Sequence, residues 1–177
     1  MIVLADTAVL SARSEVSEPD PVVTSLASYG VPLILASTAS AAAMGEWQQA
    51  LRIRHPFISG GGAALHIPSD YFEALLGFQS ATNDWHVVEI AVSGPDPSFA
   101  TAIRVLLGLF WTRRSDGLVV AVTDRHPDLL AAADVPIIVR NPILDQRDLR
   151  RCVPAAYVTN ATGCAGWAEG ILGSLTE

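Results

Sequence analysis

The sequence predicts a layered α/β fold with a mainly parallel sheet. Short apolar runs alternate with helix-like segments from one end of the chain to the other. Most of these runs are continuously apolar rather than alternating, which indicates strands buried on both faces. Gly30 and Gly117 stand where two helices should end. At 177 residues the chain is long enough for a substantial core, so we expect one domain over residues 1–177.

The apolar runs and the segments between them give the expected elements in order. The expected strands are residues 1–5, 32–36, 85–92, 118–122, 137–139 and 156–158. The expected helices are residues 21–29, 40–54, 98–111, 128–133 and 166–175. The alternation breaks between residues 59 and 97, where "ISGGGAALHIPSDYF" predicts two short strands around a glycine turn and then a short helical piece. We expect residues 59–97 to form a small insertion over the sheet.

Composition narrows the classes of function. Hydrophobic residues make up 50% of the chain and charged residues 16%, with a mean hydropathy of +0.36. This surplus predicts apolar surface that a second copy of the chain would cover. The apolar runs are strand-sized and no basic segment precedes the first one, which argues against a membrane span and a secretory signal. A net charge of −7 without a basic stripe disfavours nucleic acid. We expect a cytoplasmic homo-oligomer.

Two residue types are scarce or missing. The two cysteines, Cys152 and Cys164, are too few for a disulfide framework or a four-ligand zinc site. All 11 basic residues are arginine, and the chain contains no lysine. A mechanism that needs a lysine, as a Schiff base or as a phosphate-binding ammonium group, is therefore excluded within this chain.

Polar residues follow three of the expected strands. Asp6 follows the first strand, Ser37 and Thr38 follow the second, and "TDRHPD" (residues 123–128) follows "GLVVAV". Ligands of parallel α/β sheets bind beyond the carboxyl ends of the strands. Two carboxylates from different strand ends, with a hydroxyl between them, suit Mg²⁺, which would also hold a substrate phosphate. Taken singly, each residue also fits a structural role as a turn former or helix cap.

In this order the segments resemble the haloacid dehalogenase (HAD) superfamily, and specifically the branch that contains mannosyl-3-phosphoglycerate phosphatase. "MIVLADTA" resembles the opening Asp-x-Asp motif, with Asp6 in the first acidic position and Ala8 in the second. "GVPLILASTASAAAM" resembles the second motif, with Ser37 as the phosphate-binding hydroxyl. "VTDRHPDLLAAADVPIIV" resembles the metal-binding fourth motif, with Asp124 and Asp128 as its acids. "HPFISGGGAALHIPSDYF" resembles the segment leading into the cap, and "GCAGWAEGIL" the terminal helix.

The resemblance implies a Rossmannoid three-layer sandwich with a reduced cap and a Mg²⁺-dependent phosphatase activity. Asp6 would be the nucleophile and Ser37 its catalytic partner, while Ser37 and Thr38 would bind the substrate. The residues that the resemblance assigns to Mg²⁺ are Asp6, Ala8 (through its backbone carbonyl), Asp124 and Asp128. The implied substrate is a small phosphorylated sugar or sugar acid.

The chain departs from the family pattern in ways that bear on activity. Ala8 replaces the aspartate that acts as general acid/base, a contribution of about 10²–10⁴-fold in rate. The lysine of the third motif, which would fall near Phe99, is missing, and the cap is cut down to residues 59–97. An ungapped alignment of the fourth motif would put Val122 and His126 in the acidic positions; we prefer the gapped one, which keeps both acids at a strand end. Two hypotheses stay open: a weak or specialised phosphomonoesterase, and an inactive pseudoenzyme whose fold serves binding or assembly.

Overall fold

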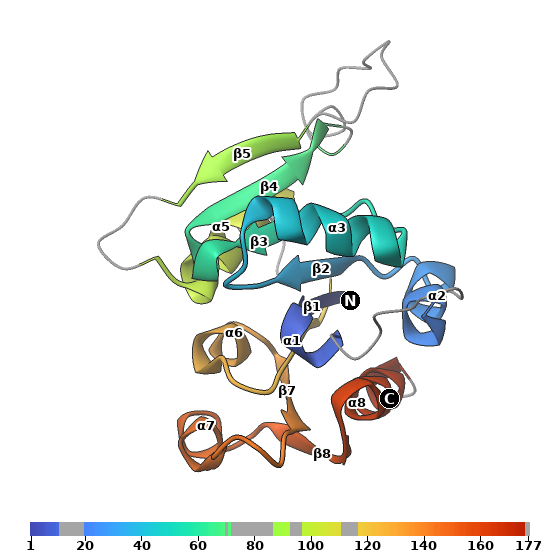
Figure 1. The fold of residues 1–177 in the computed structure, drawn as a ribbon, viewed down its shortest axis with the longest axis vertical. Helices are drawn as coiled ribbons and strands as arrows, with labels where there is room; N and C mark the ends of the chain where they lie inside the picture. Colours follow the sequence, from blue (N-terminus) through green and yellow to red (C-terminus); the bar gives the residue numbers. More distant parts are fainter. Residues whose placement is uncertain (11–19, 70, 72–86, 93–96, 111–116, 176–177) are drawn as a thin grey trace.

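A computed structural model of the chain describes residues 1–10, 20–69, 71, 87–92, 97–110 and 117–175. In these residues an eight-stranded sheet has the order β5-β4-β3-β2-β1-β6-β7-β8 (Figure 1). The strands are β1 (Ile2–Asp6), β2 (Leu33–Ala36), β3 (Phe57–Ser59), β4 (Ala64–Pro68), β5 (Val87–Ala91), β6 (Val119–Thr123), β7 (Val135–Arg140) and β8 (Tyr157–Thr162). The helices are α1 (Thr7–Leu10), α2 (Pro21–Ser28), α3 (Ala41–Leu51), α5 (Phe99–Phe110), α6 (Pro127–Ala131), α7 (Arg147–Cys152) and α8 (Gly163–Leu175), with a 3₁₀ turn at Gly60–Gly62.

Most of the sheet is parallel, as predicted. Strands β3, β2, β1, β6, β7 and β8 pair in parallel, whereas β4 is antiparallel to β3 and β5 is antiparallel to β4. Within residues 59–97, β4 and β5 therefore extend the main sheet beyond β3. Residues 70, 72–86 and 93–96 of that stretch lie outside the described residues, and the cap-like role of the insertion stays a prediction.

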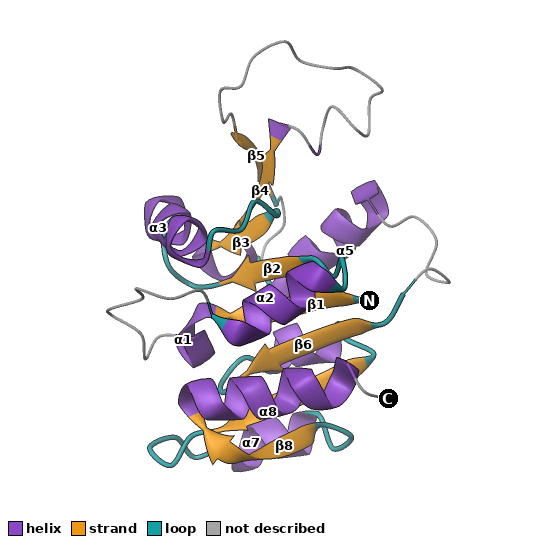
Figure 2. Ribbon diagram, turned by 90° about the vertical axis from the view of Figure 1, so that its right-hand side faces the viewer, coloured by secondary structure: helices purple, strands orange, loops and turns teal. Residues whose placement is uncertain are grey.

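Helices cover both faces of the sheet (Figure 2). One hydrophobic core joins the sheet to α1, α2, α3 and α8, and a second joins it to α5, α6 and α7. Alternate residues of β1 supply the two cores: Val3 and Ala5 belong to the first, Ile2 and Leu4 to the second. All residues of β1, β2 and β6 are buried, which confirms the layered α/β fold predicted from continuous apolar runs.

Two strands are longer than predicted, and two helices were not predicted. Strand β7 begins at Val135 and ends at Arg140 rather than spanning residues 137–139, and β8 runs to Thr162 rather than to residue 158. Strand β8 is an edge strand with only one buried residue, Thr159, so its sequence lacks the apolar run of a strand covered on both faces. Helices α1 and α7 are too short for a clear hydrophobic period.

The predicted strand at residues 85–92 and helix at residues 98–111 each reach past the described residues, at residues 85–86 and 111. No helix in the described ranges combines the length and the apolar character needed to cross a membrane.

The glycine turn between β3 and β4 determines how closely helix α5 can approach the sheet. Gly62 has a φ angle of +100°, and a Cβ atom there would lie 2.2 Å from the carbonyl carbon of Ser98 and 2.6 Å from the amide nitrogen of Phe99. Glycine adopts this backbone angle at low cost and has no Cβ atom that would collide with residues 98 and 99. The first turn of α5 can therefore pack directly against the backbone of the glycine turn, beside the carboxyl end of β3.

We expect Gly62→Ala to lower the free energy of unfolding by about 2–4 kcal/mol, because it adds an overpacking cost to that of a left-handed backbone. Gly61→Ala is the matched control: Gly61 also has a positive φ angle, +68°, but a Cβ atom there would have Cγ2 of Thr38 as its nearest neighbour, 3.8 Å away. The control should cost only about 1 kcal/mol. Urea denaturation of both variants measures the difference, and equal losses would contradict the close contact with α5.

Candidate active site

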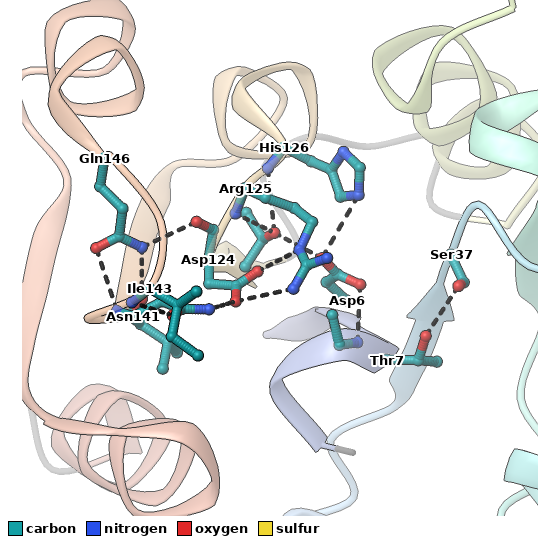
Figure 3. A network of polar contacts seen from close by, with 12 residues as sticks. Asp6, Thr7, Ser37, Asp124, Arg125, His126, Asn141, Ile143 and Gln146 are labelled. Atoms are coloured by element: carbon teal, nitrogen blue, oxygen red, sulfur yellow. Dashed lines mark hydrogen bonds and ion pairs between the residues drawn. The ribbon is translucent and has the colours of Figure 1, made fainter. Parts of the chain in front are cut away.

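Three neighbouring parallel strands bring the predicted site residues to one edge of the sheet. Strand β1 pairs with β2 on one side and with β6 on the other. Asp6 is the last residue of β1, Ser37 follows β2, and Asp124 follows β6. Their exposed fractions are 2%, 6% and 5%. The parallel pairing therefore places two buried carboxylates and one buried hydroxyl at the carboxyl ends of adjacent strands (Figure 3).

Hydrogen bonds fix the orientation of the Asp6 carboxylate. Its Oδ1 atom accepts the backbone N–H of Ala8 at 2.9 Å, and its Oδ2 atom accepts the hydroxyl of Thr123 at 2.8 Å. The hydroxyl oxygen of Thr123 accepts the backbone N–H groups of Arg125 (3.1 Å) and His126 (3.2 Å). The Nε2 atom of His126 lies 3.6 Å from Oδ2 of Asp6. The turn after β6 thus holds the carboxylate at the end of β1.

Ser37 presents a hydroxyl at the end of the neighbouring strand, bonded to Thr7, the residue after Asp6 (Figure 3). Its Oγ atom accepts the hydroxyl of Thr7 at 2.9 Å and the backbone N–H of Ala39 at 3.1 Å. Because a serine hydroxyl has one hydrogen to donate, these two accepted bonds leave that hydrogen for another acceptor, such as a phosphate oxygen. Thr38, the other predicted substrate-binding residue, is exposed on the same turn.

The carboxylate of Asp124 accepts hydrogen bonds from two side chains, a guanidinium and an amide. Arg125 donates from Nε to Oδ1 at 2.6 Å and from Nη2 to Oδ2 at 3.1 Å, and Asn141 donates from Nδ2 to Oδ2 at 2.6 Å. Burial by itself raises the pKa of Asp124, but the hydrogen bonds from Arg125 and Asn141 and the charge of Arg125 hold this pKa below its ordinary value. The hydrogen bond to Asp124 raises the pKa of Arg125, and the charges of Asp124 and Asp6 raise it further. Both partners are therefore charged at neutral pH.

The loop after β7 completes the surroundings of Asp124. Oδ1 of Asn141 accepts the backbone N–H of Ile143 at 3.0 Å, so its amide NH₂ group faces Asp124. Nε2 of Gln146 donates to the backbone carbonyls of Asp124 and Val139, both at 2.9 Å. Asn141 and Gln146 were not predicted from the sequence, because neither belongs to a motif; their position after a strand that ends at the same sheet edge was the only signal available.

Asp128 lies in a different environment from the other predicted metal ligands. Its Oδ2 atom accepts the backbone N–H of Phe99 at 2.9 Å, at the first turn of α5. The ring of Phe99 also packs edge-on against His126, with centroids 4.9 Å apart. The family's lysine would fall near Phe99, so in this lysine-free chain the Asp128 carboxylate pairs instead with the positive end of a helix.

The predicted Mg²⁺ site does not fit this arrangement. Among the described residues, no group of three His, Cys, Asp or Glu side chains is placed to hold a metal ion. Both oxygens of Asp124 accept N–H donors, and the carboxylate of Asp128 caps α5. The side chains of Asp124 and Asp128 are therefore engaged within the chain, whereas the role assigned to the backbone carbonyl of Ala8 stays a prediction.

A hollow of about 250 Å³ lies beside Asp124 and Arg125. Its lining residues are Asp124, Arg125, Pro127, Leu144, Asp145, Gln146, Asp148, Leu149 and Cys152. Asp6 and Ser37 do not line it, and its acidic residues would repel a phosphate group.

Solved structures with the same fold span almost the whole chain. A haloacid dehalogenase-like hydrolase from B. subtilis superposes with a TM-score of 0.68 at 12% identity, covering 97% of this chain and 98% of that one. A haloacid dehalogenase-like hydrolase from Bacteroides thetaiotaomicron superposes with a TM-score of 0.64 at 15% identity, covering 98% of each chain. The chain has the HAD fold. No protein-family model and no curated protein sequence matches it.

A third similar structure comes from work on a trigonal-bipyramidal intermediate in a phosphoryl-transfer superfamily; it has a TM-score of 0.63 and 10% identity, and the match covers 99% of this chain and 97% of that one. The HAD fold confirms the three-layer arrangement that the resemblance implied. The branch that contains mannosyl-3-phosphoglycerate phosphatase stays a prediction, as do the roles of the individual site residues.

We expect Asp128→Ala to lower the free energy of unfolding by about 1 kcal/mol, the usual cost of losing a helix cap. Asp128→Asn keeps an acceptor oxygen for the N–H of Phe99 and should cost less. Thermal unfolding of the two variants measures this order. If Asp128 were instead a ligand of Mg²⁺, both substitutions would weaken Mg²⁺ binding. That result would contradict the capping role.

Proposed function

We propose that the chain binds a small phosphorylated molecule at the carboxyl ends of β1, β2 and β6 and hydrolyses its phosphomonoester slowly. The observation that carries this proposal is the placement of Asp6, Ser37 and Arg125 at the carboxyl ends of the adjacent strands β1, β2 and β6. The fold supports it, because solved chains that share it are described as haloacid dehalogenase-like hydrolases. The resemblance found in the sequence favours a sugar phosphate or a phosphorylated sugar acid.

The chemistry assigns one step to each residue. A carboxylate oxygen of Asp6 attacks phosphorus, the bond between phosphorus and the leaving oxygen breaks, and water later hydrolyses the aspartyl phosphate. The hydroxyl of Ser37 donates to a phosphate oxygen, and the charge of Arg125 offsets the negative charge of the ligand. The departing alkoxide must take its proton from solvent, because Ala8 has no acidic side chain. This loss makes the reaction slower by about 10²–10⁴-fold than one with a positioned general acid.

A pseudoenzyme is the second candidate, and a specific observation favours it. Both oxygens of Asp6 accept hydrogen bonds from within the chain, and Asp124 is paired with Arg125. In such a site a phosphorylated ligand would bind without turnover. The two candidates differ only in whether Asp6 attacks phosphorus, so one substitution separates them.

A phosphatase screen over phosphorylated sugars and sugar acids should detect slow hydrolysis, and Asp6→Asn should lower the rate by at least about 100-fold, since an amide is a poor nucleophile. The matched control is Asp134→Asn. Asp134 accepts the backbone N–H of Val119 at the opposite end of β6, so its loss should leave the rate unchanged. A rate that Asp6→Asn does not alter would exclude the nucleophile, and binding without any turnover would favour the pseudoenzyme.

We also propose that the chain forms a homo-oligomer, in which a neighbouring copy covers the site. Several apolar side chains support this: Val87 and Val88 on the edge strand β5 are each 40% exposed, and Ile143 in the loop beside Asp124 is 90% exposed. Exclusion of water by such a cover would strengthen the electrostatic interactions at the phosphate. The cytoplasmic location stays a prediction from the sequence.

Light scattering at micromolar concentration should give a mass of at least twice the 18.7 kDa of the chain, because symmetric dimers are the commonest assembly. Val88→Glu would place a charge on the exposed face of β5 and should shift the mass toward the monomer if this edge forms the contact. A wild-type mass near 18.7 kDa would contradict the shared cover.

A further inference from the structure

The negative charge at the site edge is balanced by a residue of the chain. Asp6 and Asp124 are both buried at adjacent strand ends, and such a pair requires a cation nearby. Figure 3 shows the guanidinium of Arg125 bound to the carboxylate of Asp124, with Asp6 drawn on the same side of the site. We propose that Arg125 takes the place of a divalent cation here: it neutralises Asp124 by direct contact, offsets the charge of Asp6 and supplies the positive charge for a phosphoanion, so that ligand binding needs no Mg²⁺.

The distances show why Mg²⁺ is a poor competitor for this position. Mg²⁺ requires near-octahedral oxygen ligands at about 2.0–2.1 Å. Both oxygens of Asp124 are already within 2.6–3.1 Å of nitrogen donors from Arg125 and Asn141. To bind Oδ1 of Asp124, a metal ion would have to displace Nε of the charged guanidinium; to bind Oδ2, it would have to displace Nη2 of Arg125 and the amide of Asn141.

The neighbouring residues hold Arg125 in this role. Its backbone N–H donates to the hydroxyl of Thr123, and its partner Asp124 is fixed through its own backbone carbonyl by Gln146. The planar guanidinium binds the carboxylate through two of its nitrogens, Nε and Nη2. Because the guanidinium carries five N–H bonds and the side chain is 46% exposed, donors remain for the oxygens of a phosphate group.

The phosphate part of this inference rests on the proposed function, whereas the metal part does not. Removal of Arg125 should free Oδ1 of Asp124, whereas Oδ2 keeps the amide of Asn141, and should leave two acids at the edge without the guanidinium charge. The variant should then acquire the Mg²⁺ binding that the wild-type chain lacks. This gain can be measured without any substrate and without turnover.

The first test is calorimetric titration of MgCl₂ into five proteins: the wild type, Arg125→Ala, Asp124→Asn, the double variant and Arg104→Ala. The wild type should show no binding up to millimolar Mg²⁺, and Arg125→Ala should bind at least tenfold more tightly than the wild-type limit. Asp124→Asn in the Arg125→Ala background should abolish that gain. The matched control is Arg104→Ala, which removes an exposed arginine of α5 and changes the net charge equally; it should behave as the wild type.

The second test is titration of inorganic phosphate in the presence of EDTA. The wild type should bind phosphate without metal, and Arg125→Ala should weaken this binding at least tenfold, while Arg104→Ala should not. Thermal unfolding checks that each variant is folded. If Arg125→Ala does not fold, Arg125→Gln serves in both titrations, because it removes the charge and keeps an amide donor for Asp124.

Two results would overturn the inference. Mg²⁺ binding by the wild type that Asp124→Asn removes would show that Arg125 does not exclude the metal. Absence of Mg²⁺ binding in every Arg125 variant would show that no metal position lies beneath the guanidinium. Failure of the phosphatase screen is a separate outcome: a gain of Mg²⁺ binding in Arg125→Ala would support the inference even if the chain hydrolyses no phosphomonoester.

Discussion

Two carboxylates buried at neighbouring strand ends are the constraint on which the arrangement of the site depends. The parallel pairing of β1 with β6 puts Asp6 and Asp124 at the same edge, and two like charges out of water are costly unless each has a partner. The chain meets this requirement with its own groups: a guanidinium, an amide, a hydroxyl and a backbone N–H. The turns after β6 and β7 have the conformations that bring these donors to the acids.

The same requirement explains the position of helix α5. Its first residue, Phe99, donates a backbone N–H to Asp128 and packs its ring against His126, which in turn lies beside Asp6. The close approach of α5 to the sheet depends on Gly62, whose missing side chain leaves room for the backbone before the helix. A glycine turn without any polar side chain thus contributes to the position of Phe99, which contacts Asp128 and His126.

The sequence was sufficient to predict the central strands and the polar residues at their ends, because continuous apolar runs and the acids that follow them are local patterns. Strand β8 was predicted too short because an edge strand lacks such a run. The partners of the acids could not be predicted, since Arg125, Asn141 and Gln146 act through distances that only the strand order determines. The contact of Asp128 could not be predicted either. Its spacing from Asp124 fits a metal-binding motif, and its hydrogen bond to the first residue of α5 depends on how that helix packs.

The lack of lysine has a consequence for how strongly this site can hold a ligand. A lysine ammonium group is a flexible point charge, whereas a guanidinium binds a carboxylate through a rigid fork. Arg125 uses that fork on Asp124, so a phosphate group must either share the guanidinium with the carboxylate or compete for it. Sharing preserves the neutralisation of Asp124 but gives the phosphate fewer donors, whereas competition leaves a buried carboxylate with Asn141 as its remaining side-chain donor among the described residues. Either way part of the attraction is already used in the free protein, and weak binding of phosphate follows from the same contact that makes the site stable without metal.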